Sequence, residues 1–402
     1  MKSFYKKYHR AKVSFWNAVA TEWNAIKLDK ALISTFLSVA FVILIVYTYL
    51  YSREVITEVP VAIVNQDESK TSRDYISMLN ASKGIYTKTN YTDLKAAEED
   101  YYENIVKGIV VIPKDFGKDL RRGRQTTIST YADASNMLFY KEILGDVTVT
   151  TGYFNAGIAI KKEMAKGNSM AQAKANYSPV QAVTTSLFNV SSGYATYLIP
   201  VLTALIVQLV LLMGIGIING TRHEDNKMLS NFPRLLHKGG TIPVLLGKSF
   251  VYTSLFSIIL PLQIGIVYSL FSIPVRSSIW MVYLFSLPYL LAIVFFGIAI
   301  SSLFKRREDS IVFIVLTSIP SLMLSGLSFP IETFPKFYQY FTQIIPSTPG
   351  INGFVKLTQM EATISEVSPE WNHLWVLALV YFIIATVTLK LQSIKERKIS
   401  TK

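Results

Sequence analysis

The sequence predicts an α-helical polytopic membrane protein with six transmembrane helices and a small α/β extracytoplasmic domain between helices 1 and 2. Three observations predict this architecture. Half of the 402 residues are hydrophobic, and they gather into blocks of about 20 residues, the length that crosses a bilayer as a helix. One long segment, residues 52–193, has instead the composition of a soluble domain. The formal net charge of +13 lies on one side of the predicted spans.

The distribution of charge orients the chain. The segments 1–30, 219–248, 303–310 and 390–402 hold 20 Lys and Arg against 7 acids, whereas residues 52–193 hold 17 against 16. Cytoplasmic loops of membrane proteins carry an excess of Lys and Arg, so both termini are expected in the cytoplasm. Because this rule accounts for the whole positive excess, a nucleic-acid partner is not expected.

Residues 1–30 are predicted to form an amphipathic elbow helix in the cytoplasmic interface. Its apolar positions recur at helical spacing, with Lys12, Glu22 and Lys27 on other positions. These apolar positions are Phe15, Trp16, Val19, Trp23 and Ile26. The first span follows at residues 31–51 and ends in an aromatic belt, which is typical of a membrane boundary.

Residues 52–193 are predicted to form the extracytoplasmic α/β domain. Residues 59–64 and 109–112 have the pattern of short buried strands, and residues 126–131 alternate as a third strand. Helical stretches lie between them at residues 72–80 and 92–104, with Thr92 as the expected N-cap of the second. Few helix breakers occur from residue 135 to 175, so a long helix or a pair of helices is expected there.

The remaining chain, residues 194–402, is predicted to form a transmembrane domain with five further spans. The expected spans are residues 194–218, 245–271, 279–303, 310–329 and 371–389. The loop between the first two of these carries an apolar stripe, Met228, Leu229 and Phe232, in polar surroundings. Such a stripe fits the groove of a partner protein as a short helix, and the alternative is that it lies on the bilayer surface.

The span at residues 310–329 ends unusually. Gly326, Pro330 and Pro335 punctuate its exit, which predicts a broken helix at the outer membrane boundary. The apolar pieces that follow, up to Met360, are too short to cross and are expected to form a re-entrant or interfacial hairpin. The break is therefore a candidate outer gate.

Catalytic chemistry is not expected in this chain. Cysteine is absent, and the four histidines are far apart in sequence, so neither a thiol nucleophile nor a metal site is predicted. Gly247, Lys248 and Ser249 end like a phosphate-binding loop, but Ile242 stands where that motif needs glycine. Lys248 is better explained as an anchor at the positive side of the membrane.

The spans also lack charged residues away from their ends, which argues against a secondary transporter with a carboxylate relay. Gln208 is the one strongly polar side chain expected near the middle of the membrane. It fits either a translocation path or an ordinary hydrogen bond between helices.

Several short patterns, in their order along the chain, resemble the permease subunits of ABC-2 type exporters, a family that includes bacterial drug-efflux permeases. The matching segments are residues 22–30 (EWNAIKLDK), 60–67 (PVAIVNQD), 108–116 (GIVVIPKDF), 131–136 (YADASN), 187–189 (LFN), 198–200 (LIP) and 325–335 (SGLSFPIETFP).

The resemblance implies a bacterial cytoplasmic (inner) membrane protein that pairs with a second permease subunit, homo- or heterodimeric, and with a separate ABC ATPase. ATP and Mg would be bound by that ATPase, and no cofactor by this chain. Membrane lipids would surround it, and a periplasmic adaptor protein is left open. An elbow helix at Glu22 and a coupling helix would contact the ATPase. The implied coupling residues are Glu22, Glu224, Asp225, Met228, Leu229 and Phe232.

The family's coupling loop often reads Glu-x-Glu-x-Gly-Thr, whereas here Gly220 and Thr221 precede a single Glu224 and Asp225. In the related fold, spans two and five line the pathway. The path residues that this implies are Gln208, Met323, Ser325 and Phe329.

The expected function is therefore that of a transport subunit rather than an enzyme. It would export a lipophilic or amphipathic substrate, because the path residues are apolar, polarisable and flexible. The alternative is a membrane-anchored cell-envelope assembly or receptor protein without transport activity.

Overall fold

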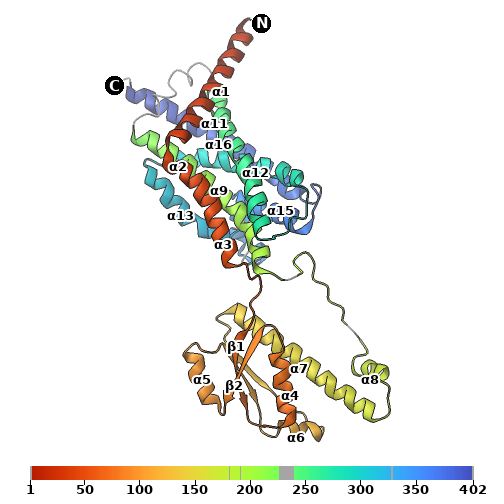
Figure 1. The fold of residues 1–402 in the computed structure, drawn as a ribbon. Coiled ribbons are helices and arrows are strands. Elements are labelled where there is room, and N and C mark those ends of the chain that lie inside the picture. The colour runs from red at the N-terminus through yellow and green to blue at the C-terminus, as the bar shows by residue number, and fades with distance from the viewer. Residues whose placement is uncertain (1, 181, 191, 226–239, 327–328, 401–402) are drawn as a thin grey trace. The chain divides into compact units, whose positions relative to one another are not determined.

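The structure is a computed structural model that describes residues 2–180, 182–190, 192–225, 240–326 and 329–400. It divides into two compact units (Figure 1). The first unit combines Met1–Glu54 with Ser186–Lys402, and the second is Val55–Thr185.

The first unit has helices as its regular secondary structure in the described residues. Its first half contains α1 (Lys2–Leu28), α2 (Lys30–Ser34), a π-helix (Thr35–Ile43), α3 (Leu44–Leu50), α9 (Tyr194–Glu224), α11 (Thr241–Gln263) and a second π-helix (Ile264–Tyr268). Its second half contains α12 (Ile279–Ser301), α13 (Arg307–Met323), a 3-10 turn (Ile331–Thr333), α14 (Lys336–Gln343), α15 (Ser347–Met360) and α16 (Ser368–Ser400).

Among the described residues, five helical segments are long and apolar enough to cross a membrane. They are Lys30–Leu50, Tyr194–Glu224, Thr241–Tyr268, Ile279–Ser301 and Ser368–Ile394. Each overlaps one of the predicted spans, so the chain is a mostly helical membrane protein. The remaining predicted span, residues 310–329, corresponds to α13. This helix has 17 residues, which at 1.5 Å per residue gives about 25 Å.

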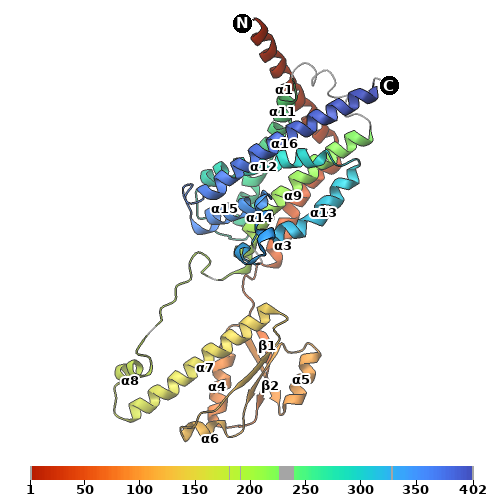
Figure 2. The ribbon, with the colours of Figure 1, turned by 180° about the vertical axis from the view of Figure 1, so that it is seen from behind.

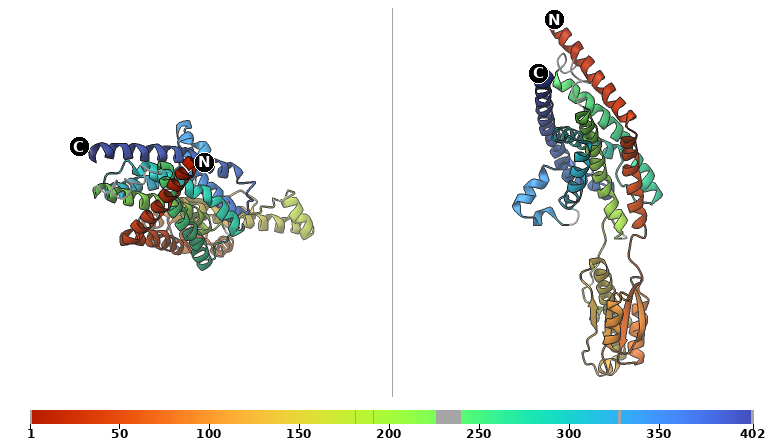
Figure 3. Two further views of the ribbon diagram at one scale, coloured as in Figure 1. Left: turned by 90° about the horizontal axis from the view of Figure 1, so that it is seen from above. Right: turned by 90° about the vertical axis from the view of Figure 1, so that its left-hand side faces the viewer.

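The centre of the first unit is α9, which is buried along most of its length. It packs against α12, α13 and α15, while α1 lies along α11 and α12 lies along α16. Figure 2 shows α9, α13 and α16 inclined in a similar direction and α1 crossing them, with the start of α1 and the end of α16 at the same end of the unit (Figure 3). Most of the buried apolar side chains described in the unit form one continuous cluster.

The second unit is a four-stranded sheet with helices on both faces. Its strands are β1 (Val59–Asn65), β2 (Ile85–Tyr91), β3 (Gly108–Ile112) and β4 (Ser129–Ala132), in the spatial order β2-β1-β3-β4. The strand β1 is parallel to β2 and β3, and β4 is antiparallel to β3. The strand β2 lies in a segment for which no strand was predicted.

Side chains alternate along β1, so both faces of the sheet carry apolar residues and both are covered by helices. Val61 and Ile63 belong to the core formed with α4 (Lys70–Asn80) and α7 (Met137–Ala165). Ala62 and Val64 belong to a smaller core with α5 (Leu94–Tyr102). Figure 2 shows α5 on the face opposite α4 and α7. Two shorter helices, α6 (Phe116–Arg121) and α8 (Met170–Tyr177), complete the unit.

The N-cap predicted for α5 was wrong by one residue. Asp93, not Thr92, caps this helix, because its side chain accepts the backbone N–H of Ala96 at 2.8 Å. A carboxylate is favourable there, since it also interacts with the positive end of the helix dipole.

Candidate functional site

One face of α1 is buried, and it carries a carboxylate. The buried positions are Ser14, Ala18, Glu22 and Ile26, which recur every four residues and so form one stripe. Trp16 and Trp23 lie outside this stripe and are exposed. The sequence prediction had placed Glu22 among the polar positions of this helix. The structure instead places Glu22, only 2 % exposed, against the rest of the unit.

Glu22 is held by side chains from two other helices. Arg222 of α9 donates a hydrogen bond to Glu22 Oε2 at 2.8 Å, and the hydroxyl of Tyr252 of α11 donates to Oε1 at 2.7 Å. Lys248 of α11 lies 3.8 Å from Oε2. We call Glu22, Arg222, Lys248 and Tyr252 the ion cluster. It joins α1, α9 and α11 at a single point.

The cluster keeps Glu22 ionised. Burial by itself would raise the pKa of this carboxyl, but the charges of Arg222 and Lys248 and the hydrogen bonds from Arg222 and Tyr252 outweigh it. The net effect lowers the pKa of Glu22 from 4.5 to about 2. A buried carboxylate that keeps its charge is stable only with such partners, because an unpaired charge in this environment is very unfavourable.

A glycine allows α1 and α11 to approach closely beside the cluster. A Cβ atom at Gly247 would lie 2.6 Å from the carbonyl oxygen of Phe15 and 2.8 Å from Cβ of Ala18. Gly247 and Lys248 therefore belong to a helix contact. The expectation that Lys248 is an anchor at the membrane surface was wrong, since Lys248 is only 4 % exposed and faces Glu22.

A second ion pair lies where α1 ends. Asp29 caps α2 by accepting the N–H of Leu32 at 3.0 Å, and it also binds Arg307 at the start of α13 at 2.8 and 3.1 Å. Glu224 at the end of α9 accepts the backbone N–H of Arg307 at 3.1 Å. The ends of α1, α9 and α13 are thus joined by charged groups.

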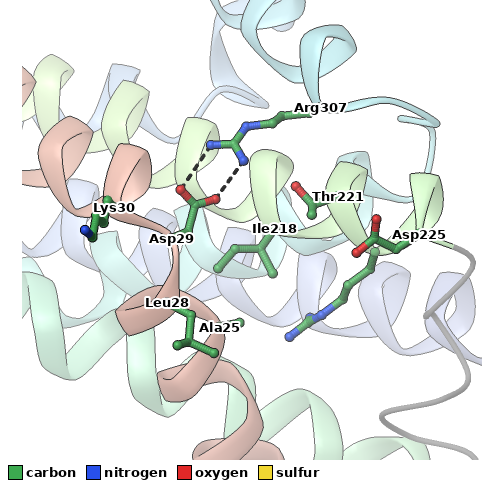
Figure 4. A pocket seen from close by; sticks show the side chains of 9 residues that line it. Ala25, Leu28, Asp29, Lys30, Ile218, Thr221, Asp225 and Arg307 are labelled. Atoms are coloured by element: carbon green, nitrogen blue, oxygen red, sulfur yellow. Dashed lines mark hydrogen bonds and ion pairs between the residues drawn. The ribbon is translucent and has the colours of Figure 1, made fainter.

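A pocket of about 620 Å³ opens beside these two ion pairs (Figure 4). It is lined by Ala25, Leu28, Asp29, Lys30, Ile218, Thr221, Arg222, Asp225 and Arg307. Three predicted coupling residues therefore lie at or next to this pocket. Asp225 lines it, and Glu22 and Glu224 bind two other lining residues, Arg222 and Arg307. Met228, Leu229 and Phe232 lie outside the described residues.

Gln208 lies inside the helical unit. It is 1 % exposed, and its amide nitrogen donates to the hydroxyl of Ser347 in α15 at 3.2 Å. Gln263 of α11 is a second buried amide that the sequence prediction overlooked, and it donates to the carbonyl oxygen of Ala40 at 2.7 Å. Ala40 lies in the π-helix between α2 and α3, where the wider turn alters the backbone hydrogen bonding.

The other predicted path residues lie around the end of α13 and differ in burial. Ser325 is buried and donates to the carbonyl oxygen of Leu322 at 2.6 Å, whereas Met323 and Phe329 are exposed. Phe329 stacks on Phe334, with ring centroids 6.1 Å apart. The hydrogen bond of Gln208 goes to α15 and not to this group.

The helix break predicted after residue 325 has a clear backbone basis. Gly326 has a φ of +88°, a left-handed conformation that disfavours other residues. Pro330 precedes the 3-10 turn and Pro335 precedes α14. Gly326 also lines a pocket of about 390 Å³, together with Tyr197, Val201, Glu332, Ile351, Asn352, Val355, Lys356, Met360 and Glu370.

Arg222, Lys248 and Tyr252 are members of the ion cluster that the sequence analysis did not identify. A weak signal for the contact exists in α1, where the small residues Ser14 and Ala18 lie on the same stripe as Glu22. Small residues on one stripe are typical of closely packed membrane helices. The partners on α9 and α11 are at least 200 positions away, so only the tertiary structure pairs them.

Comparison with known proteins gives the family. The match to Linearmycin resistance permease protein LnrN of Bacillus subtilis is 25 % identical over 331 residues, 77 % of this chain and 82 % of the relative. The match to Probable multidrug ABC transporter permease YbhR of Escherichia coli is 26 % identical over 204 residues, 50 % of this chain and 53 % of the relative. The match therefore spans about half the length of that E. coli relative.

A third relative is ABC transporter G family member 20 of Dictyostelium discoideum, 20 % identical over 325 residues, 79 % of this chain and 42 % of the relative. The profile of the ABC-2 family transporter proteins matches residues 30–387, most of the chain. The chain belongs to the ABC-2 family of transporter proteins, as the ABC-2 permease resemblance of its sequence predicted.

Proposed function

We propose that this protein is the permease subunit of an ATP-driven exporter, and that a separate ATPase subunit drives it through the ion cluster. The observation that carries the proposal is the junction of α1, α9 and α11 at Glu22. ABC-2 permeases work with an ATPase. The ion cluster joins α9 and α11, the two helices that border the predicted coupling loop, to α1, so it is well placed to receive a movement of the ATPase. ATP and Mg would be bound by the ATPase, and this chain would bind neither.

The ion cluster makes these three helices move as one body. Separating a buried ion pair leaves an uncompensated charge and costs about 3–5 kcal/mol. A push on α1, or on the loop that follows α9, would therefore be passed to α11 before the cluster breaks. The pairs of Asp29 and Glu224 with the start of α13 would extend the same movement to that helix.

A six-span topology agrees with this role. The start of α1 and the end of α16 lie at the same end of the helical unit, as an even number of spans requires (Figure 1). Counting α13 as the sixth span would place both basic termini in the cytoplasm and the α/β unit outside. The first of these placements follows the positive-inside rule. The bacterial inner membrane is the expected location.

The proposed cargo is lipophilic or amphipathic. It would pass along α9 and α13 and leave near Gly326, whose pocket combines apolar walls with Glu332, Lys356 and Glu370. Relatives named as a multidrug permease and a linearmycin resistance permease support export of drug-like compounds. A second permease subunit, identical or different, would complete the pathway, and a periplasmic adaptor remains a separate question for experiment.

The ATPase contact can be tested by co-purification. The full chain carrying Met228→Asp, Leu229→Asp and Phe232→Asp together should lose the co-purifying ATPase and its ATP turnover. A matched control replaces three exposed apolar residues elsewhere, Val180, Val183 and Leu187, with Asp. It should keep both. Unchanged association and turnover in the first variant would refute the coupling assignment.

Transport itself needs a second measurement. A strain lacking the gene should accumulate some members of a panel of amphipathic compounds, and the wild-type gene should restore their efflux. The alternative, an envelope assembly or receptor protein, predicts unchanged accumulation across the panel and no ATPase in the purified complex.

A further inference from the structure

The α/β unit contains two adjoining hollows that the proposed transport mechanism does not use. They have volumes of about 230 and 400 Å³ and share Tyr101, Tyr102 and Asp133. Both lie where the end of α5 meets β4 and the loop leading to α7. All the residues that line them belong to the second unit.

The smaller hollow is built from aromatic rings and carboxylates. Tyr101, Tyr102 and Tyr131 supply the rings, and Glu98 and Asp133 supply the negative charges. Ile109 and Ala132 complete the lining, so none of its residues is a Lys or Arg. Aromatic faces and carboxylates attract the same kind of group, a cation with an organic surface.

Asp133 is kept in its charged form. The hydroxyl and the backbone N–H of Ser135 donate hydrogen bonds to its two oxygens at 2.6 and 2.8 Å, and these lower the pKa of Asp133. Desolvation and the neighbouring charge of Asp133 raise the pKa of Tyr101, so this ring stays a neutral phenol. The hollow therefore holds negative charge at neutral pH.

The larger hollow contains one lysine, Lys107, and its ammonium group already has partners within the protein. Lys107 lies over the ring of Phe139, 5.7 Å from its centroid, and also donates to Asn104 at 3.1 Å. The protein's own ammonium group thus lies over an aromatic ring in the larger hollow, whereas the smaller hollow is lined by no Lys or Arg.

Tyr101 packs against the smaller core of the unit, but packing does not account for the other two tyrosines of the smaller hollow. Tyr102 is 81 % exposed and Tyr131 is 52 % exposed, and neither belongs to the buried core of the unit. Exposed aromatic residues grouped around a concave surface are typical of a binding site.

We propose that the smaller hollow binds an organic ammonium group. The group would lie against the rings of Tyr101 and Tyr131, with Glu98 and Asp133 supplying the opposite charge, and the rest of the ligand would extend into the larger hollow. Such a group occurs on free amines and on zwitterionic lipid headgroups, and both share this chemistry.

The test uses the full-length protein in a maltoside detergent and choline as the probe. Its neutral isostere, 3,3-dimethylbutan-1-ol, has the same shape without the charge. Titration followed by saturation-transfer NMR should give choline an affinity at least tenfold higher than that of the isostere. Equal binding of the two would overturn the proposal.

Substitutions locate the site. Glu98→Gln and Asp133→Asn should each weaken choline binding at least threefold, whereas Glu99→Gln on the same helix, outside the lining, should not change it. Tyr131→Leu should also weaken choline binding, and because Tyr131 is exposed this variant should fold normally. Wild-type affinity in both Glu98→Gln and Tyr131→Leu would refute the assignment.

A last comparison identifies the source of the group. Monomeric dihexanoylphosphatidylcholine should bind more tightly than choline if the natural ligand is a lipid headgroup, since its phosphate and chains would contact the larger hollow. Tighter binding of choline would indicate a free amine. If neither binds, the proposal is wrong, while the transport function is tested separately by efflux.

Discussion

At the scale of single residues, the negative charge of Glu22 balances two buried cations, Arg222 and Lys248. Its carboxylate accepts hydrogen bonds from both Arg222 and Tyr252 and lies 3.8 Å from Lys248 Nζ. Removing the charge would leave the cations in place without this partner. The cost of such a change is set by desolvation, because water cannot replace the missing carboxylate at a buried site.

Glu22→Gln is expected to lower the free energy of unfolding by about 3–5 kcal/mol, because it breaks a buried ion pair from one side. Chemical or thermal unfolding of the purified chain in detergent measures this. Glu103→Gln, an exposed acid in the α/β unit, is the control and should change stability by less than about 0.5 kcal/mol. Equal stability of the two variants would contradict the role of the cluster.

The same carboxyl predicts a dependence on pH. Its folded pKa of about 2 lies below its unfolded value of 4.5, so its contribution is complete above about pH 5 and is lost as the pH falls towards 2. The stability difference between wild type and Glu22→Gln should therefore be about 3 kcal/mol at pH 6 and shrink steadily below pH 4.5. A difference that does not change between pH 6 and pH 3 would contradict this.

At the scale of helices, the contact of α1 with α11 depends on the absence of a side chain at Gly247. The backbone of α1 occupies the space where a Cβ would be. This close approach brings Lys248 and Tyr252 of α11 within reach of Glu22, so the packing of the two helices and the ion cluster depend on each other.

Gly247→Ala should therefore destabilise the protein by about 1–3 kcal/mol, because the new methyl group overlaps Phe15 and Ala18 and forces the helices apart. Gly265→Ala is a matched control in the π-helix that follows α11. No atom lies within 4 Å of the corresponding Cβ position, so this variant should be neutral or slightly more stable. Thermal unfolding of both variants measures the difference. Similar effects would show that the contact does not limit the packing.

At the scale of the whole molecule, the open question is how many times the chain crosses the membrane. Five helical segments in the described part of the chain have the length and composition of spans, and α13, with 17 residues, is shorter than each of them. If α13 crosses, the chain between α15 and α16 lies outside. If it does not, this segment lies on the same side as Lys305.

Single cysteines test this directly, because the natural chain has none. Ala171→Cys and Glu361→Cys should react with a membrane-impermeant maleimide in intact cells. Lys305→Cys and Ser400→Cys should react only after the membrane is permeabilised. Reaction of Ser400→Cys in intact cells, with Glu361→Cys protected, would show that α13 does not cross and would replace the six-span topology by five spans.

The sequence predicted the helices better than their contacts. Apolar length located the segments that became α9, α11, α12 and α16, because the bilayer demands about 20 apolar residues whatever the packing. The ends were less predictable. The helix α9 continues six residues beyond the predicted end at 218, since Arg222 is stabilised inside by Glu22 and not by solvent.

Within the α/β unit, the strands β1 and β3 lie where buried apolar runs were found. The strand β2 has the sequence IYTKTNY, in which only alternation marks the strand. Its place at the edge of the sheet, paired with β1, explains why it carries polar residues.

By itself, the sequence determined the family and the helical membrane class, since each depends on local composition or on short motifs. The tertiary structure decided which side chains meet. Glu22 with Arg222 and Lys248, Gln208 with Ser347, and Asp29 with Arg307 are pairs far apart in the chain. Such pairs form because a buried charge or amide must find a partner once water is excluded, and only the packing of the helices determines which partner is near.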